Sequence, residues 1–330
     1  MADRANVAAI AAGVLEGDRG SIAAALNLVE DRRPLARADV AALMGSLSAH
    51  TARAQRVGVT GPPGVGKSTL VAALSRALRR GTATSPPRTL GVLAVDPTSV
   101  RSGGALLGDR ARIAPDPDDH GLFVRSLATQ GEMGGLAPSV PLGALILSAA
   151  FDVMIVETVG VGQTETDVRF VVDTLVFVVQ PGSGDSLQFM KAGVMEVPDV
   201  LVVNKCDQVD LARMAALELR SALTSLRAAG MAPERTPLLS TCALDGAGVE
   251  ALVGAIDAHR AAITASGQLE RHRRDGTLAW AMRLFARRFG EVGVEKVGGE
   301  DALRGALALA LDQGRAVLDA VEALGTGAGP

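Results

Sequence analysis

The sequence has few aromatic residues: among 330 residues there are seven Phe, one Trp and no Tyr. Proteins that stack bases or sugars need aromatic rings, so this composition argues against a base-stacking platform. The charges agree, because 33 Lys and Arg against 36 Asp and Glu give a formal net charge of −3, without the basic excess that a phosphate backbone requires. We therefore expect no nucleic-acid partner.

Cysteine is equally scarce, since Cys206 and Cys242 are the two in the chain. Two cysteines are too few for a disulfide framework, and the four scattered histidines add no Cys/His metal spacing. No apolar run reaches the roughly 18 to 20 residues that a membrane span needs. The first residues also lack the basic-then-apolar order of a secretory signal. These absences predict a cytoplasmic protein that does not associate with a membrane.

Apolar residues make up 48% of the chain, which is enough for a sizeable core, and the length suggests about two folding units. Residues 1–55 are dense in Ala and Leu and lack the alternation of a strand. We expect two or three helices there, forming an N-terminal extension, with a break at Pro34 and a new N-cap at Asp39.

Residues 56–258 have a different pattern, in which short apolar runs end in Gly, Pro, Asp or Asn. The runs are RVGVT (56–60), LGVLAVD (90–96), GLFVRS (121–126), DVMIVE (152–157), TLVFVVQ (174–180), DVLVVN (199–204) and TPLLST (236–241). Stretches between them, such as 68–80 and 142–150, have the length and composition of crossover helices. This alternation predicts an α/β fold with a mostly parallel sheet covered by helices on both faces.

The strand pattern stops after about residue 258. Apolar residues at helical spacing over 268–290, and an Ala/Leu-rich stretch over 300–324, predict a helical tail for residues 259–330. We interpret the basic run 271–274 as a solvated helix face.

A phosphate-binding loop follows the first apolar run. The segment from Gly61 to Ser68 matches G-x4-G-K-[ST] and lies between a predicted strand and a predicted helix, as that motif requires. Its glycines let backbone N–H groups face the phosphates, Lys67 reaches the outer phosphates, and Ser68 can hold Mg²⁺. The predicted nucleotide-binding residues here are Gly61, Pro62, Pro63, Gly64, Val65, Gly66, Lys67, Ser68 and Thr69.

A second motif specifies the base. Asn204, Lys205 and Asp207 fit N-K-x-D at the end of the 199–204 run. A carboxylate at Asp207 can accept hydrogen bonds from N1–H and the 2-amino group of guanine, whereas adenine would leave it unpaired. We expect discrimination of about a thousandfold, and hence GTP or GDP as the ligand.

A later loop completes this predicted base site. Cys242, Ala243 and Leu244 lie where such proteins place a backbone N–H against the guanine carbonyl. We interpret Cys206 and Cys242 as small filler residues beside the base rather than redox groups.

Three acidic residues are candidates for the metal side of the site. Glu157, in E-T-V-G after an apolar run, stands where D-x-x-G is usual and can still hold Mg²⁺. Asp96 ends another run, although it could instead cap a helix. Asp109 lies in a Gly-rich loop and could be an ordinary loop acid. With Ser68, these are the predicted metal ligands.

In and around the motifs described above, the sequence resembles the GTPase chaperones of adenosylcobalamin-dependent acyl-CoA mutases. The family is known as MeaB in bacteria and MMAA in animals, and older descriptions call it ArgK or LAO/AO transport ATPase. The resemblance covers about residues 20–255. Its segments are 58–70, 92–113, 156–168, 181–207 and 240–252.

The resemblance implies a P-loop NTPase core of the SIMIBI type, shared with signal-recognition-particle and nickel-insertion GTPases, and it implies a homodimer built through C-terminal helices. It implies that Ser68, Asp96, Asp109 and Glu157 are Mg²⁺-side ligands. It makes the loop with Asp109 the first switch, residues 157–166 the second, and residues 181–191 the third, with Asp185 and Lys191. The third switch would sense a bound mutase.

The expected reaction is hydrolysis of GTP with Mg²⁺, and the predicted catalytic residues are Lys67, Asp109, Glu157 and Gln163. No Gln directly follows Gly160, so we expect slow turnover that a partner accelerates. The resemblance implies that this partner is an adenosylcobalamin-dependent acyl-CoA mutase of the methylmalonyl-CoA mutase type. It also implies that the protein gates the loading and protection of the mutase's cofactor. Alternative functions are a nickel-type metallochaperone GTPase, and a kinase or transport ATPase.

Overall fold

The computed structural model describes residues 4–31, 33, 35–83, 85–96, 118–128, 136–158, 167–182, 198–228, 230 and 236–327.

The centre of the molecule is a seven-stranded sheet in which every pair of neighbouring strands is parallel, in the order β3-β2-β4-β1-β5-β6-β7. The strands are β1 Gln55–Thr60, β2 Leu90–Asp96, β3 Leu122–Ala128, β4 Val153–Glu157, β5 Thr174–Val179, β6 Val200–Val203 and β7 Leu238–Ser240. Each of the seven apolar runs forms one strand, so the predicted α/β fold is confirmed. Strands β1, β4, β5 and β6 are buried at every position, which is why they lack alternation.

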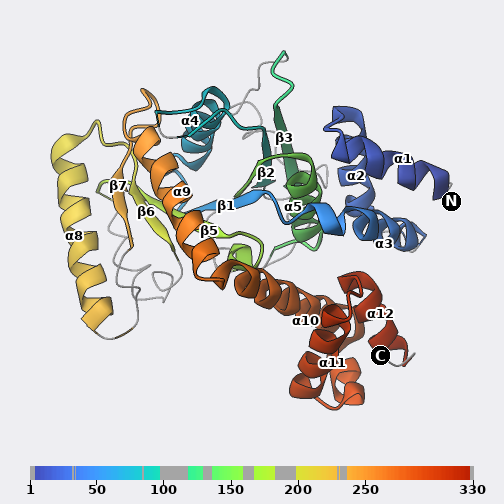
Figure 1. The fold of residues 1–330 in the computed structure, drawn as a ribbon. Coiled ribbons are helices and arrows are strands. Elements are labelled where there is room, and N and C mark those ends of the chain that lie inside the picture. The colour runs from blue at the N-terminus through green and yellow to red at the C-terminus, as the bar shows by residue number, and fades with distance from the viewer. Residues whose placement is uncertain are drawn as a thin grey trace, which may run out of the picture.

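Helices cover both faces of this sheet (Figure 1). On one face, α4 Lys67–Arg80 and α9 Val249–Ala265 share a core with Val57 and Val176. On the other face, α5 Ser139–Ala150 packs over β2 and β4, and α8 Val209–Ala228 packs over β6. This two-sided cover is the predicted arrangement.

The N-terminal segment forms α1 Arg4–Leu15, α2 Arg19–Glu30, α3 Ala36–Leu47 and the short 3-10 helix η1 Ser48–His50. The three α-helices pack against α5 and share its core. The prediction that Asp39 caps α3 is wrong, because Leu35 already has helical angles (φ −68°, ψ −26°) and Asp39 lies in the first turn.

The C-terminal segment is helical, as predicted, and leads away from the sheet (Figure 1). It forms α10 Gln268–Val297, α11 Glu300–Asp312 and α12 Val317–Thr326, which share a small core around Phe285. The backbone of α10 is interrupted at Gly290, where φ is 65° and ψ is −173°.

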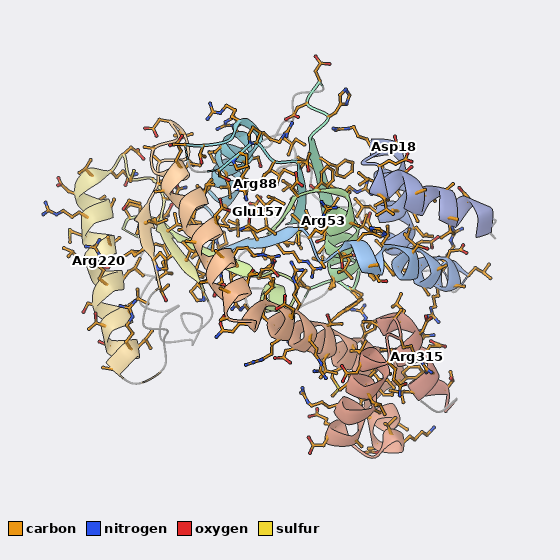
Figure 2. The ribbon with its side chains drawn as sticks, in the orientation of Figure 1. Asp18, Arg53, Arg88, Glu157, Arg220 and Arg315 are labelled. Atoms are coloured by element: carbon orange, nitrogen blue, oxygen red, sulfur yellow. The ribbon has the colours of Figure 1, made fainter. Side chains whose placement is uncertain are left out.

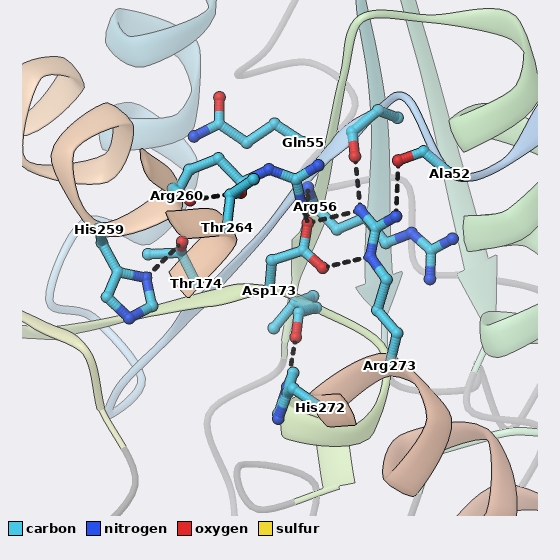
Figure 3. Close-up of polar contacts among 12 residues, drawn as sticks. Ala52, Gln55, Arg56, Asp173, Thr174, His259, Arg260, Thr264, His272 and Arg273 are labelled. Atoms are coloured by element: carbon cyan, nitrogen blue, oxygen red, sulfur yellow. Dashed lines mark hydrogen bonds and ion pairs between the residues drawn. The ribbon is translucent and has the colours of Figure 1, made fainter. Parts of the chain in front are cut away.

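The base of α10 is anchored by a buried ion cluster at the amino end of β5 (Figure 3). The Asp173 side chain, 1% exposed, accepts hydrogen bonds from Arg273 at 2.7 Å, from Arg260 at 2.5 Å and from the Arg56 backbone N–H at 3.0 Å. Burial opposes ionisation of Asp173, but the hydrogen bonds from Arg273 and the charges of the three arginines hold its pKa below the usual value. Burial, together with the nearby Arg273 charge, lowers the pKa of Arg56 to about 10.

The interpretation of the run 271–274 as a solvated face is therefore wrong for two of its members. Arg273 faces Asp173, and Nε2 of His272 donates to the carbonyl oxygens of Arg169 and Val172. Arg274 does lie at the surface, where it pairs with the half-exposed Asp312. The run is split because α10 lays one side against the 3-10 helix η2 Val168–Phe170 and the residues around it.

Candidate active site

The strand register brings the phosphate loop and the E-T-V-G segment together. Strands β1 and β4 are neighbours, and Val59 pairs with Glu157. The Thr60 and Thr158 hydroxyls lie 2.8 Å apart, and the Thr158 N–H donates to Val59 O at 3.1 Å. Because the carboxyl ends of parallel strands meet at one sheet edge, Glu157, which is labelled in the central part of the molecule in Figure 2, lies at the same edge as the loop that starts at Gly61.

The phosphate loop needs glycine at two close approaches. Gly61 has φ 140°, and a Cβ there would lie 2.1 Å from the carbonyl oxygen of Val178. Gly66 has φ 91°, and its Cβ would lie 2.6 Å from Nδ2 of Asn204. A side chain at either position would collide with an adjacent loop or strand, so these glycines keep the cradle narrow.

Lys67 opens α4 and reaches back across the loop. Its buried ammonium donates to Gly61 O at 2.9 Å and to Pro62 O at 3.0 Å. The first turn of α4 adds backbone N–H groups and the positive end of the helix dipole at the same place. Together these groups form a cradle suited to phosphate oxygens.

The donor set for a divalent cation is partly in place. The Ser68 hydroxyl donates to Oε1 of Glu157 at 2.7 Å, and both residues are buried. A hydroxyl and a carboxylate are hard oxygen ligands that suit Mg²⁺. Asp96 ends β2 on the other side of β4, and its side chain lies outside the described part of the structure. Asp109, Gln163, Asp185 and Lys191 also lie outside the described residues, so their roles stay predictions.

Asn204 joins the phosphate loop to the later loop. Its Nδ2 donates to Val65 O at 2.9 Å, and its Oδ1 accepts from the Thr241 hydroxyl at 3.1 Å and the Ala243 N–H at 3.2 Å. The side chain is buried, so Asn204 fastens the walls of the site together.

The loop at 242–248 lies against the N-K-x-D segment. The Cys206 N–H donates to Thr241 O at 3.1 Å, and Cys242 Sγ lies 3.7 Å from Oδ1 of Asp207. Asp207 and Leu244 are exposed at the rim of this pair of loops. Both cysteines are free thiols, and burial raises the pKa of Cys206, which disfavours a reactive thiolate.

One site residue was missed by sequence reasoning. Gln180 directly follows β5, and its Oε1 accepts a hydrogen bond from the Lys205 ammonium at 2.5 Å. Lys205 also donates to Gly64 O at 2.9 Å. The signal that could have identified Gln180 is its position as the polar residue that ends an apolar run.

Two kinds of feature are absent from the described residues. None of their helices combines the length and apolar character needed to cross a membrane. Within the same residues, no three His, Cys, Asp or Glu side chains gather as a metal-binding group.

Comparisons with known proteins agree with this site. Residues 22–295 match the family model described as "Methylmalonyl Co-A mutase-associated GTPase MeaB". The chain is 39% identical over 286 residues to the "Probable GTPase Mb1533" of Mycobacterium bovis, which covers 86% of this chain and 83% of that protein. It is 32% identical over 292 residues to the "Methylmalonic aciduria type A homolog, mitochondrial" of Caenorhabditis elegans, covering 84% and 72% of the two chains. A crystal structure of an LAO/AO transport system kinase superposes with a TM-score of 0.69 at 27% identity, over 99% of both chains.

Proposed function

The chain belongs to the MeaB family of GTPases, and from this premise we propose that it is a GTP-controlled chaperone of an adenosylcobalamin-dependent acyl-CoA mutase of the methylmalonyl-CoA mutase type. Binding and hydrolysis of GTP would gate the loading, protection or release of the mutase's cobalamin cofactor. The observation that carries the proposal is the assembly of a phosphate cradle, the Ser68–Glu157 pair and a guanine-type loop in a chain of this family. The family description and the name of the nematode relative support the choice of partner.

On the phosphate side, Lys67 would exchange its two carbonyl partners for the outer phosphates of the nucleotide. Ser68 and Glu157 would hold Mg²⁺, for which Asp96 and Asp109 are further proposed ligands. When bound, Mg²⁺ would neutralise part of the negative charge of the phosphates. Ser68 and Glu157 are buried, so bulk water would be excluded from their contact with the cation and the electrostatic attraction there would be stronger.

On the base side, Asp207 would accept from N1–H and the amino group of guanine. Two amides of the later loop are already engaged, because the Cys242 N–H donates to Ala247 O and the Ala243 N–H donates to Asn204 Oδ1. The predicted contact with the guanine carbonyl therefore requires Ala243 to share its N–H, or Leu244 to supply one.

Hydrolysis by the protein alone would be slow, because phosphoryl transfer needs a group that orients the attacking water and no Gln directly follows Gly160. The proposed catalytic residues are Lys67, Asp109, Glu157 and Gln163. A mutase that reorders the switch segments would accelerate turnover, and the third switch, with Asp185 and Lys191, is the proposed sensor. We also propose that the protein acts as a homodimer through its C-terminal helices.

Two other functions are weaker alternatives. The structural neighbour is called a transport system kinase, which suggests a kinase or transport ATPase, but the placement of Asn204 and Asp207 favours a guanine ligand. A nickel-type metallochaperone would need a Cys/His site. The described residues contain no such group.

The test is GTP turnover measured alone and with each candidate adenosylcobalamin-dependent acyl-CoA mutase, with and without its cofactor. We expect the cognate mutase to raise the rate by about a hundredfold or more, as activating partners do for other GTPases. A Lys67→Ala variant, which lacks the phosphate-binding ammonium, is the control for contaminating activity. An unchanged rate with every candidate mutase contradicts the proposal.

A further inference from the structure

The backbone of Lys205 is in a conformation that lysine rarely adopts. Its φ is 61°, and among the described residues it is the one non-glycine residue with positive φ. Such a left-handed residue is strained and persists where its surroundings fix it. The flanking backbone is fixed, because the Asn204 N–H donates to Val179 O at 2.9 Å and the Cys206 N–H donates to Thr241 O at 3.1 Å.

The side chain of Lys205 is held as firmly as its backbone. Its ammonium donates to Gly64 O in the phosphate loop at 2.9 Å and to Oε1 of Gln180 at 2.5 Å. Strand β5 lies between β1 and β6, so the residue that follows β5 sits between the phosphate loop and the N-K-x-D segment. Gln180 therefore lies next to the segment that follows β6, which contains Lys205.

We propose that Gln180 is a positioning residue for guanine-nucleotide binding: its amide oxygen holds the Lys205 ammonium against the phosphate loop and so fixes the lysine stem beside the base site. The proposal rests on the nucleotide site described above and not on the mutase partner. Nothing in the phosphate-loop or N-K-x-D motifs assigns this role to Gln180.

The physical need for Gln180 comes from the chemistry of lysine. Its stem is flexible, and its ammonium has three donors to satisfy. With both oxygens in place, the stem is confined between two anchors, Gly64 O in the phosphate loop after β1 and Oε1 of Gln180 after β5. Without the Gln180 oxygen, water competes for the ammonium, the stem swings outward, and the left-handed turn at residue 205 loses its side-chain anchor. Bound guanine nucleotide would then leave faster.

The experiment measures dissociation of fluorescent GDP in the presence of Mg²⁺ from the full-length protein. Gln180→Met keeps the length of the side chain but removes the acceptor, whereas Gln180→Glu keeps an oxygen. The matched control is Gln208→Met. Gln208 lies in the same loop as Lys205, its side chain is exposed, and its backbone N–H donates to Lys205 O at 3.2 Å. We expect Gln180→Met to release GDP about tenfold faster, and the other two variants to stay within about twofold of the parent.

A second measurement separates positioning from general damage. In a Lys205→Met background, adding Gln180→Met should accelerate release by a much smaller factor than in the parent, because the contact between the amide oxygen and the Lys205 ammonium is already lost. The proposal is overturned if Gln180→Met releases GDP no faster than Gln208→Met, or if it accelerates release by the same factor in both backgrounds. If Gln180→Met fails to fold, Gln180→Ala replaces it under the same criteria. Failure of the parent protein to bind GDP would instead overturn the nucleotide site itself.

Discussion

Replacement of Arg273 by methionine should lower the stability of the protein far more than the same change one position later. Arg273 makes four hydrogen bonds, each 2.7 Å long, two to the Asp173 carboxylate and two to the carbonyl oxygens of Ala52 and Ala54. Arg274 has one exposed ion pair, with Asp312. Methionine and arginine have similar helix propensities, so the helix itself should tolerate both changes.

The size of the effect follows from burial. The Asp173 side chain is 1% exposed and that of Arg273 is 15% exposed, so the pair lies in a region of low dielectric. Breaking a buried ion pair costs about 3–5 kcal/mol. In the variant, Asp173 still accepts hydrogen bonds from the Arg260 guanidinium and the Arg56 N–H. The expected loss in the free energy of unfolding is therefore near the lower end of that range, about 3 kcal/mol.

The control change is expected to be nearly silent. The Arg274 and Asp312 side chains are 59% and 48% exposed, and such pairs contribute about 0–1 kcal/mol. Urea unfolding followed by circular dichroism gives both free-energy differences under the same conditions. Equal losses for Arg273→Met and Arg274→Met would refute the assignment of Arg273 as the anchor of α10.

The remaining predictions concern acid, magnesium and the base. Because the pKa of Asp173 is lowered in the fold, its contribution is complete above its unfolded pKa of about 3.9 and is lost as the pH falls through the lower folded value. As the pH is lowered, the free energy of unfolding of Arg273→Met should therefore fall less steeply than that of the parent protein. Parallel curves of unfolding free energy against pH for the two proteins would contradict this. Glu157→Gln should raise the Mg²⁺ concentration needed for GTP binding by about tenfold, since a charged ligand is lost; an unchanged titration would exclude Glu157 from the metal site. Asp207→Asn should weaken GTP binding and favour xanthosine triphosphate by about a hundredfold, measured by competition with fluorescent GDP; equal binding of ATP by the parent would exclude guanine selection.

The strands could be predicted because they are buried on both faces. In an all-parallel sheet such strands lose the polar alternation that marks a surface strand, and each becomes an uninterrupted apolar run. The order of the strands depends on contacts between distant segments, such as Val59 with Glu157, and no single run encodes it.

The role of Arg273 could not be predicted for a related reason. Arg271, Arg273 and Arg274 are equivalent in a linear sequence, and what separates them is which side of α10 packs against η2 and the residues around it. The local clue is Gly276, where a Cβ would lie 2.4 Å from the carbonyl oxygen of Phe170. A glycine at that point lets the helix come close enough for its neighbours to reach buried partners.

In the candidate site, too, some residues could be predicted from the sequence and others could not. The phosphate loop and Asn204 were identified because their chemistry is tied to a local spacing, whereas Gln180 acts through the adjacency of β5 and β6. A spacing of 25 residues between Gln180 and Lys205 carries no signal by itself.

Strand β5 therefore carries two different tasks at its two ends. Asp173 precedes the strand and anchors α10 at the amino edge of the sheet, whereas Gln180 follows it and contacts the nucleotide loops at the carboxyl edge. In parallel α/β sheets ligands bind at the carboxyl edge, so changes at the amino edge should act on stability alone. Arg273→Met should lower the free energy of unfolding without speeding GDP release. Gln180→Met should speed GDP release without lowering the free energy of unfolding. A variant that changes both quantities together would show that the ends of β5 are coupled through the strand.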